Sequence, residues 1–154
     1  MRLAFALALV AFSACSLAEE DASVQVVVSL PVGSPAGLDA AVSVGRRPVP
    51  LDAVPQRGGF AATAGPVAVR PGRSTVACAI TDGSASTTGT LALDLTPGFT
   101  YDVACAVAAE DPADRCFGCQ GSEAVALDPA LGFDDGLSLY LVWSETDPDN
   151  VVLY

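Results

Sequence analysis

The chain contains no histidine and no lysine, and all seven of its basic residues are arginines. Without histidine it has no Ser-His-Asp triad, no Cys-His pair and no imidazole ligand for a metal. Without lysine it has neither a Schiff-base residue nor the phosphate-binding lysine of a P-loop. Because no nucleophile–base pair and no cofactor-binding loop is found either, we expect no enzyme and assign no catalytic, cofactor-binding or metal-ligating residue.

Positive charge is scarce as well, since the formal net charge of the 154 residues is −11. Nucleic acids and anionic lipid surfaces bind basic footprints, so neither is an expected partner. The pair Arg46-Arg47 is too small a patch to change this expectation. Hydrophobic residues make up 51% and charged residues 16%, a composition typical of a packed globule. The length fits one domain.

The N-terminus has the pattern of an export signal. Residues 3–12 form an unbroken apolar run after Met1-Arg2, and a bilayer-spanning helix would need about 20 such residues. Residues 13–15 (SAC) resemble the end of a bacterial lipobox, in which Cys15 would be lipidated, although Phe12 stands where leucine is usual. Residues 16–18 (SLA) instead fit an ordinary signal-peptidase site, and an uncleaved anchor is the third alternative.

These patterns predict a signal peptide at 1–18, a short tether at 19–22 and a single domain at 23–154. The product would be extracytoplasmic, either periplasmic or secreted, or anchored in the outer membrane through a lipid on Cys15. Such an anchor would be its only membrane contact. Four cysteines remain in the folded part in either case, and an even number in an exported domain normally forms two disulfides. Spacing alone leaves three connectivities open for Cys78, Cys105, Cys116 and Cys119.

Apolar residues alternate with small or polar residues along most of the chain, the period of a half-buried antiparallel strand. Glycine, proline and aspartate occupy the breaks, and eleven prolines and fourteen glycines leave little room for a long helix. Many short strands at this spacing indicate an all-β antiparallel sandwich. The expected strands are 24–30, 38–44, 75–80, 90–95, 101–107 and 137–143, with weaker candidates at 60–63, 66–69, 122–127 and 151–154.

Residues 95–103 (LTPGFTYDV) resemble the L-x-P-G-x-x-Y-x-V segment of fibronectin-III, immunoglobulin-like and transthyretin-like bacterial domains. In those folds the Pro-Gly turn carries the chain from one sheet to the other, and the tyrosine hydroxyl ties the corner. The resemblance implies a Greek-key-type sandwich with this corner at Pro97-Gly98 and Tyr101. It implies a fold and no activity. The chain departs from antibody-type domains because Tyr101 precedes Cys105 by four residues instead of two.

The segment Cys116-Phe117-Gly118-Cys119 is the most motif-like part of the chain. A redox C-x-x-C pair belongs at a helix N-terminus, whereas this one lies among turn formers. Haem attachment would need histidine where Gln120 stands, and a four-cysteine zinc site would need a second knuckle. Gly118 suits the third position of a type II turn, whose ends are close enough for a disulfide. We favour a structural disulfide, with a redox or metal pair as the alternatives.

The other two cysteines lie on the apolar faces of their strands, so both should point into the core. In a simple meander their strands would be second neighbours, about 9.6 Å apart, too far for a disulfide. We predict the pattern 78–105 and 116–119, with the first bridge joining neighbouring strands of one sheet. This requires the 90–95 strand to leave that sheet and cross to the other one, as the Pro97-Gly98 corner suggests.

The remaining candidates have simpler explanations. Turn-borne carboxylates can bind calcium, but no complete calcium loop is found, and solvated turn acids are the default interpretation. Trp143 falls on an apolar strand face and is expected in the core rather than on a ligand platform. The acids lie at Glu110, Asp111, Asp114, Asp134, Asp135, Glu145, Asp147 and Asp149.

The leading hypothesis is therefore a non-enzymatic extracytoplasmic module that binds a protein or glycan partner in the cell envelope or has a structural role there. The alternative, from a different class, is a redox- or metal-dependent accessory factor that uses Cys116 and Cys119.

Overall fold

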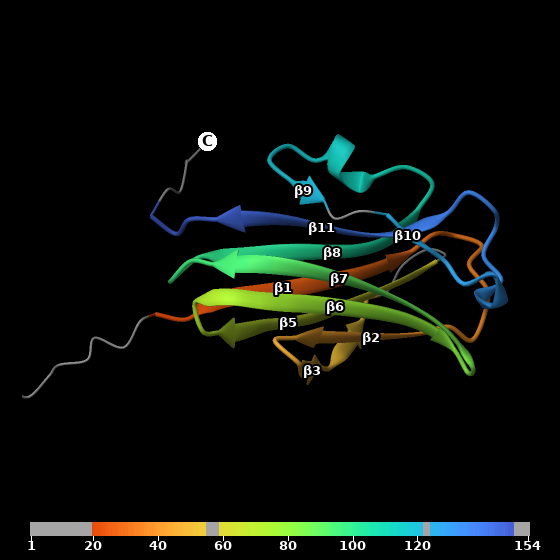
Figure 1. Cartoon of the computed structure of the whole chain (residues 1–154), viewed down its shortest axis with the longest axis horizontal. Helices are drawn as coiled ribbons and strands as arrows, with labels where there is room; N and C mark the ends of the chain where they lie inside the picture. Colours follow the sequence, from red (N-terminus) through yellow and green to blue (C-terminus); the bar gives the residue numbers. More distant parts are fainter. Residues whose placement is uncertain (1–19, 55–58, 122–123, 150–154) are drawn as a thin grey trace, which may run out of the picture.

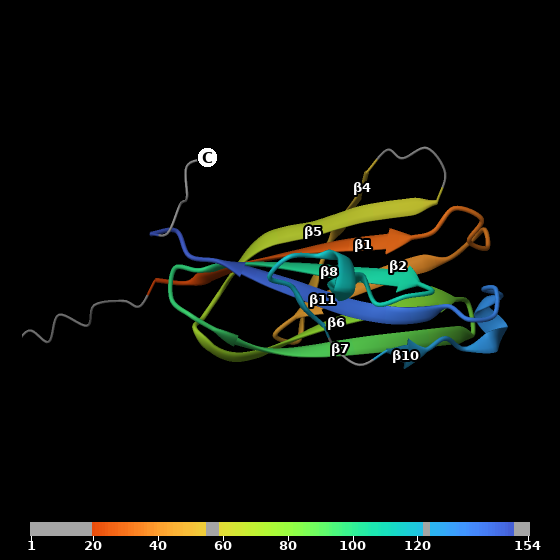
Figure 2. The ribbon, with the colours of Figure 1, turned by 90° about the horizontal axis from the view of Figure 1, so that it is seen from above.

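The computed structural model describes residues 20–54, 59–121 and 124–149. The predicted signal peptide with Cys15, and the strand expected at 151–154, lie outside these residues. Within them the chain is all-β, with one sheet of seven strands and one of four that enclose a common core as a sandwich. Most of the long strands run along the long axis of the molecule (Figures 1 and 2).

The seven-stranded sheet has the order β10-β11-β8-β1-β5-β4, with β9 also paired to β11. Its strands are β1 (Ala22–Leu30), β4 (Leu51–Ala53), β5 (Phe60–Val69), β8 (Thr100–Ala108), β9 (Gln120–Gly121), β10 (Val125–Ala126) and β11 (Ser138–Thr146). The four-stranded sheet has the order β3-β2-β6-β7. Its strands are β2 (Asp39–Val44), β3 (Arg47–Val49), β6 (Gly72–Asp82) and β7 (Ala85–Leu95). Two short 3-10 helices complete the described elements, η1 (Pro112–Arg115) and η2 (Pro129–Leu131).

Period-2 alternation correctly predicts which side chains form the core. In β1 every second residue from Ala22 to Leu30 is buried, and in β7 burial alternates along all eleven residues. Each fully buried valine or leucine contributes roughly 1.5–3 kcal/mol relative to its exposed state. The six strands expected from the clearest alternation are all present, and β7 extends beyond 90–95 to begin at Ala85.

Two features of the strand pairing differ from expectation. The weak candidates 60–63 and 66–69 form one continuous strand, β5, and the register of its pairing with β1 shifts between Val24 and Val26. The sheet is also not purely antiparallel, because β1 pairs in parallel with β8. Alternation predicts which face of a strand is buried and carries no information on the direction of its neighbour, so it could not predict this pair.

The short strands β3 and β4 were not predicted. β3 follows β2 through a two-residue turn in which Gly45 and Arg46 have φ angles of 57° and 70°. Two consecutive positive φ values are the signature of a type I′ turn, which matches the twist of the flanking strands. The Arg46-Arg47 pair therefore belongs to a hairpin at the edge of the four-stranded sheet.

The predicted crossing of the 90–95 strand is wrong. β7 stays beside β6, with continuous antiparallel pairing from Gly72↔Leu95 to Asp82↔Ala85. The chain changes sheets after β7, at Pro97-Gly98, and β8 then enters the seven-stranded sheet.

The corner itself has the form that the resemblance implies. The Tyr101 hydroxyl accepts a hydrogen bond from the backbone N–H of Thr96 at 2.8 Å and donates one to the carbonyl of Asp94 at 3.2 Å. Tyr101 is 0% exposed, so one buried side chain on β8 holds the end of the preceding strand.

Cys78 and Cys105 form a disulfide with a Cα–Cα distance of 6.6 Å, and both residues are 0% exposed. The predicted partner and the predicted core orientation are confirmed. The expectation that the bridge joins neighbouring strands of one sheet is wrong, because Cys78 lies on β6 and Cys105 on β8, in different sheets. The two cysteines face each other across the core, so the argument from second-neighbour spacing does not apply.

No helix in the described ranges is long and apolar enough to span a bilayer.

Candidate functional site

The chain between β8 and β9 forms a loop over the outer face of the seven-stranded sheet (Figures 1 and 2). We refer to residues 109–121 as the 109–121 loop. It contains η1, which begins at a proline and is capped by Asp111, whose carboxylate accepts a hydrogen bond from the N–H of Ala113 at 2.9 Å. The loop ends in β9, where Gln120 and Gly121 pair with Trp143 and Val142 of β11. The C-terminal end of the loop is thus attached to the sheet through β11.

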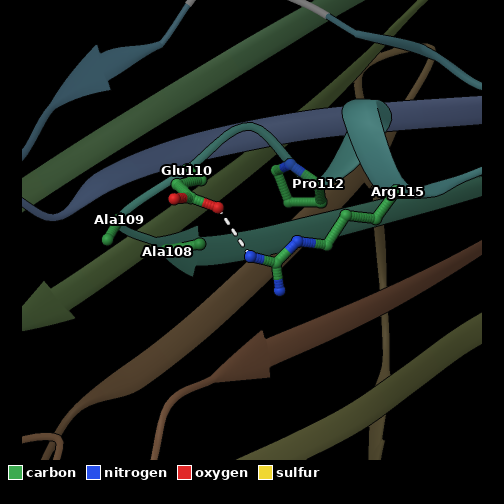
Figure 3. Close-up of a pocket in the computed structure, with 5 residues that line it drawn as sticks. All are labelled: Ala108, Ala109, Glu110, Pro112 and Arg115. Atoms are coloured by element: carbon green, nitrogen blue, oxygen red, sulfur yellow. Dashed lines mark hydrogen bonds and ion pairs between the residues drawn. The ribbon is translucent and has the colours of Figure 1, made fainter.

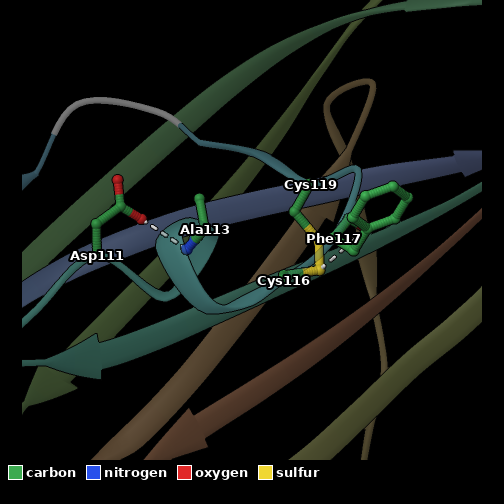
Figure 4. The surroundings of a disulfide bond; sticks show 5 residues. All are labelled: Asp111, Ala113, Cys116, Phe117 and Cys119. Carbon is green, nitrogen blue, oxygen red and sulfur yellow. Dashed lines mark hydrogen bonds between the residues drawn. A yellow bond between two sulfur atoms is a disulfide. The ribbon is translucent and has the colours of Figure 1, made fainter.

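The Cys116–Cys119 disulfide closes the tip of this loop, with a Cα–Cα distance of 5.4 Å (Figure 4). Gly118 has a φ of 74°, the left-handed conformation expected at the third position of a type II turn. Cys116 lies at the C-terminal end of η1, where its N–H donates to the carbonyl of Ala113 at 3.2 Å. This is the opposite end from the helix N-terminus at which redox C-x-x-C pairs sit. The predicted pairing is confirmed.

An apolar groove of about 250 Å³ lies between this loop and the sheet. From here on it is called the loop groove. Its floor comes from β1, β8 and β11, and its wall from the loop. The residues that line it are Val27, Asp102, Val103, Ala104, Pro112, Cys116, Cys119, Val142, Trp143 and Ser144.

Two valines on the outer face of the seven-stranded sheet show that this face is apolar where the loop lies over it. Val142 follows the core residue Leu141 and so lies at an outward position of β11, yet it is only 4% exposed because the 109–121 loop covers this part of the strand. Val27, at the outward position of β1, is 39% exposed. Outward positions of a half-buried strand are usually polar, so valines there are a sequence signal for an apolar site on the outer face. Sequence reasoning missed this signal.

Phe117 stands at the tip of the loop beside the disulfide (Figure 4) and is 106% exposed. Phe117 does not line the loop groove itself, but it lies between Cys116 and Cys119, which do. Its exposed ring therefore adds apolar area beside the groove, and apolar area of this kind on a surface marks candidate interaction sites.

A second depression, of about 440 Å³, lies on another side of the same loop (Figure 3). Its lining consists of Ala108, Ala109, Glu110, Pro112 and Arg115. Glu110 and Arg115 form an ion pair at 2.6 Å, with side chains 71% and 79% exposed. Because both side chains are so exposed, the pair contributes little to stability.

Some acids in the turns accept structural hydrogen bonds from nearby backbone groups. The carboxylate of Asp147 accepts from the N–H of Asp149, and that of Asp128 from the N–H of Ala130, each at 2.9 Å. Across the described ranges, no three histidine, cysteine or acidic side chains gather closely enough to hold a metal ion. The calcium alternative therefore gains no support from this part of the chain.

No protein-family model, no curated protein and no solved structure matches this chain. The function of the loop groove is therefore inferred from its own geometry.

Trp143 packs against the core, as expected, and also borders the loop groove. It lies on the core-facing register of β11, opposite Val103, and its ring centroid is 6.1 Å from that of the buried Tyr101. It is packed against the core but only partly buried, and it is among the residues that line the loop groove.

Proposed function

We propose that the chain is a non-enzymatic extracytoplasmic module that binds a protein partner at the loop groove. The observation that carries this proposal is the apolar lining of the groove, beside which the wall carries the fully exposed Phe117. The groove is built on the strands of a rigid sandwich, and its wall is held by a capped 3-10 helix, a disulfide and the β9–β11 pairing. Such a surface is formed before a partner arrives, which lowers the entropic cost of binding.

The chemistry of the lining favours a protein side chain over a glycan. Apolar side chains and a disulfide form most of the lining, and Asp102 and Ser144 supply its polar side chains. A sugar presents many hydroxyl groups that would lose their hydrogen bonds to water in such a site. An aromatic or aliphatic side chain of a partner loses none, and a groove of about 250 Å³ has room for one.

Charge indicates what should surround that side chain. The chain carries a net charge of −11, and Asp102 lies at the groove itself. A partner with arginine or lysine beside its apolar residue would be attracted to this surface, and an acidic partner repelled. We therefore propose an exposed peptide segment in which apolar and basic residues alternate.

Isothermal titration calorimetry with two synthetic peptides tests this proposal. One peptide alternates phenylalanine with arginine, and the matched peptide has glutamate in place of arginine. We expect saturable binding of the first peptide only. Val27→Glu places a charge in the groove, and it should weaken binding at least tenfold, since burial of one apolar side chain is worth about 1.5–3 kcal/mol.

Val32→Glu is the matched control, because Val32 is 77% exposed and does not line the groove. It adds the same charge and should leave the affinity within twofold. If attraction to the acidic surface alone caused binding, both variants would bind the basic peptide as well as the natural chain or better. That result would overturn the proposal.

We also propose export to the cell envelope, with a signal peptide and a lipid on Cys15. Two cysteine pairs at disulfide distance are consistent with an extracytoplasmic location. The intact mass of the native protein tests the processing. A diacylglyceryl adduct on a chain lacking 14 residues supports the anchor, whereas a free N-terminus at Glu19 contradicts it.

A second candidate function, a redox- or metal-dependent accessory factor, is favoured by the exposed position of Cys116 on the loop. Such a factor would catalyse repeated reduction or oxidation of a substrate disulfide, or would retain zinc through purification. A turnover assay on a disulfide-bonded protein and metal analysis of the native chain distinguish it from a binding module.

A further inference from the structure

The two disulfides differ sharply in their access to solvent. Cys78 and Cys105 are both 0% exposed and face each other across the core. Cys116 is exposed, and Cys119 is partly buried above the sheet. Thiol–disulfide exchange requires a thiolate to approach a sulfur atom directly, so access decides which disulfide reacts.

The space in front of the Cys116–Cys119 turn is open. Phe117 and Gly118, the two residues between the cysteines, are both exposed, and no heavy atom lies within 4 Å of the position that a Cβ would take on Gly118. A reductant could therefore reach the turn without any movement of the sandwich.

The loop also keeps other supports when this disulfide opens. The Asp111 cap of η1, the hydrogen bond from Cys116 N–H to Ala113 and the pairing of β9 with β11 do not involve the sulfur atoms. The bridge spans a sequence separation of only 3, compared with 27 for the inter-sheet bridge. Because a short loop restricts the unfolded chain less, opening this bridge costs less folding stability than opening the other.

From these observations we infer that Cys116–Cys119 is a thiol–disulfide exchange site for a dithiol reductant, and that it opens while the inter-sheet disulfide and the fold stay intact. A thiolate of the reductant attacks the sulfur of Cys116, the Cys116–Cys119 bond breaks, and Cys119 leaves as a thiolate that takes up a proton. The second thiol of the reductant then attacks the mixed disulfide. Cys116 is released as a thiol, and the reductant, oxidised by two electrons, closes its own disulfide.

Both cysteines line the loop groove, so the exchange site and the groove share a wall. The exchange does not depend on the proposed binding function, because its test uses no groove ligand. Failure of one proposal is therefore distinguishable from failure of the other.

The test is a time course with dithiothreitol on the folded, oxidised protein, followed by alkylation and peptide mapping. We expect Cys116 and Cys119 to be alkylated at least tenfold faster than Cys78 and Cys105, with unchanged circular dichroism. In denaturant, where burial is lost, the inter-sheet disulfide should also open readily. The Cys116→Ser/Cys119→Ser variant should incorporate no label under native conditions.

A monothiol tests the direction of attack. Glutathione should give a mixed disulfide that peptide mapping places on Cys116, the exposed member of the pair. An adduct on Cys119 would contradict that assignment. Simultaneous opening of both disulfides in native buffer, or opening of Cys116–Cys119 only in denaturant, would overturn the inference.

Discussion

Replacement of Tyr101 by phenylalanine tests whether one hydroxyl group holds the corner between the two sheets. Tyr101→Phe removes the hydrogen bond that the hydroxyl accepts from Thr96 N–H at 2.8 Å and the one that it donates to the Asp94 carbonyl at 3.2 Å. Phenylalanine fits the same buried space and keeps the ring contact with Trp143. The variant therefore isolates the two hydrogen bonds from the packing of the ring.

The expected loss of stability is about 2 kcal/mol. A net hydrogen bond contributes about 1 kcal/mol, and a buried donor without a partner costs about 1–3 kcal/mol. The expected loss is below the upper limit of about 3 kcal/mol because Thr96 and Asp94 are exposed residues. Water can therefore reach part of the backbone that loses its hydrogen bonds. In a domain of this size each kcal/mol of lost stability lowers Tm by about 3–4 °C. A loss of about 2 kcal/mol therefore lowers Tm by roughly 7 °C.

Urea unfolding followed by circular dichroism measures the effect, with Tyr140→Phe as the matched control. Tyr140 lies at an outward position of β11 opposite Ala106, and the described part of the chain offers its hydroxyl no hydrogen-bond partner. The control should stay within about 0.5 kcal/mol of the natural chain. If both variants unfold at the same urea concentration, the corner does not depend on the Tyr101 hydroxyl, and the reasoning is refuted.

Three further predictions concern the core and the charge. Cys78→Ala/Cys105→Ala should lose about 3.5 kcal/mol in the chain-entropy model for a separation of 27 residues; an unchanged unfolding midpoint in urea would contradict it. Gly89→Ala should lose about 1–3 kcal/mol by the same measurement, because the added Cβ would lie 2.5 Å from Leu141 Cδ1 in the opposite sheet. With no histidine or lysine, no side chain of the oxidised domain at 23–154 has an ordinary pKa between about 6 and 9, so its Tm should be nearly constant across that range. A sharp transition near pH 7 would reveal a perturbed group.

The sequence by itself determined the long strands and which face of each is buried, whereas the short strands β3, β4 and β9 were not predicted. Alternation in β1, β6 and β8 places Val26, Cys78 and Cys105 in the core, and all three are 0% exposed. Local turn chemistry also predicted the Cys116–Cys119 bridge, since the distance across a four-residue turn depends only on the turn itself. The corner at Tyr101 was predicted from the resemblance of residues 95–103 to the corner segment of other sandwich domains, and its hydrogen bonds join residues at most seven positions apart.

Only the tertiary structure decided how the strands combine into two sheets. The pairing of β7 with β6 does have a local signal that sequence reasoning missed, the two-residue turn Gly83-Ser84, in which Gly83 has a φ of 53°. The alternation, however, is the same on the core faces of both sheets, so no local pattern shows which sheet β8 joins or that β1 runs parallel to it. For that reason the sequence predicted the partner of Cys78 correctly and its place wrongly, within one sheet instead of between two. The loop groove has the same origin. Val27 and Val142 lie 115 positions apart in the sequence and become lining residues of one groove only because β1, β8 and β11 are adjacent and the 109–121 loop covers them.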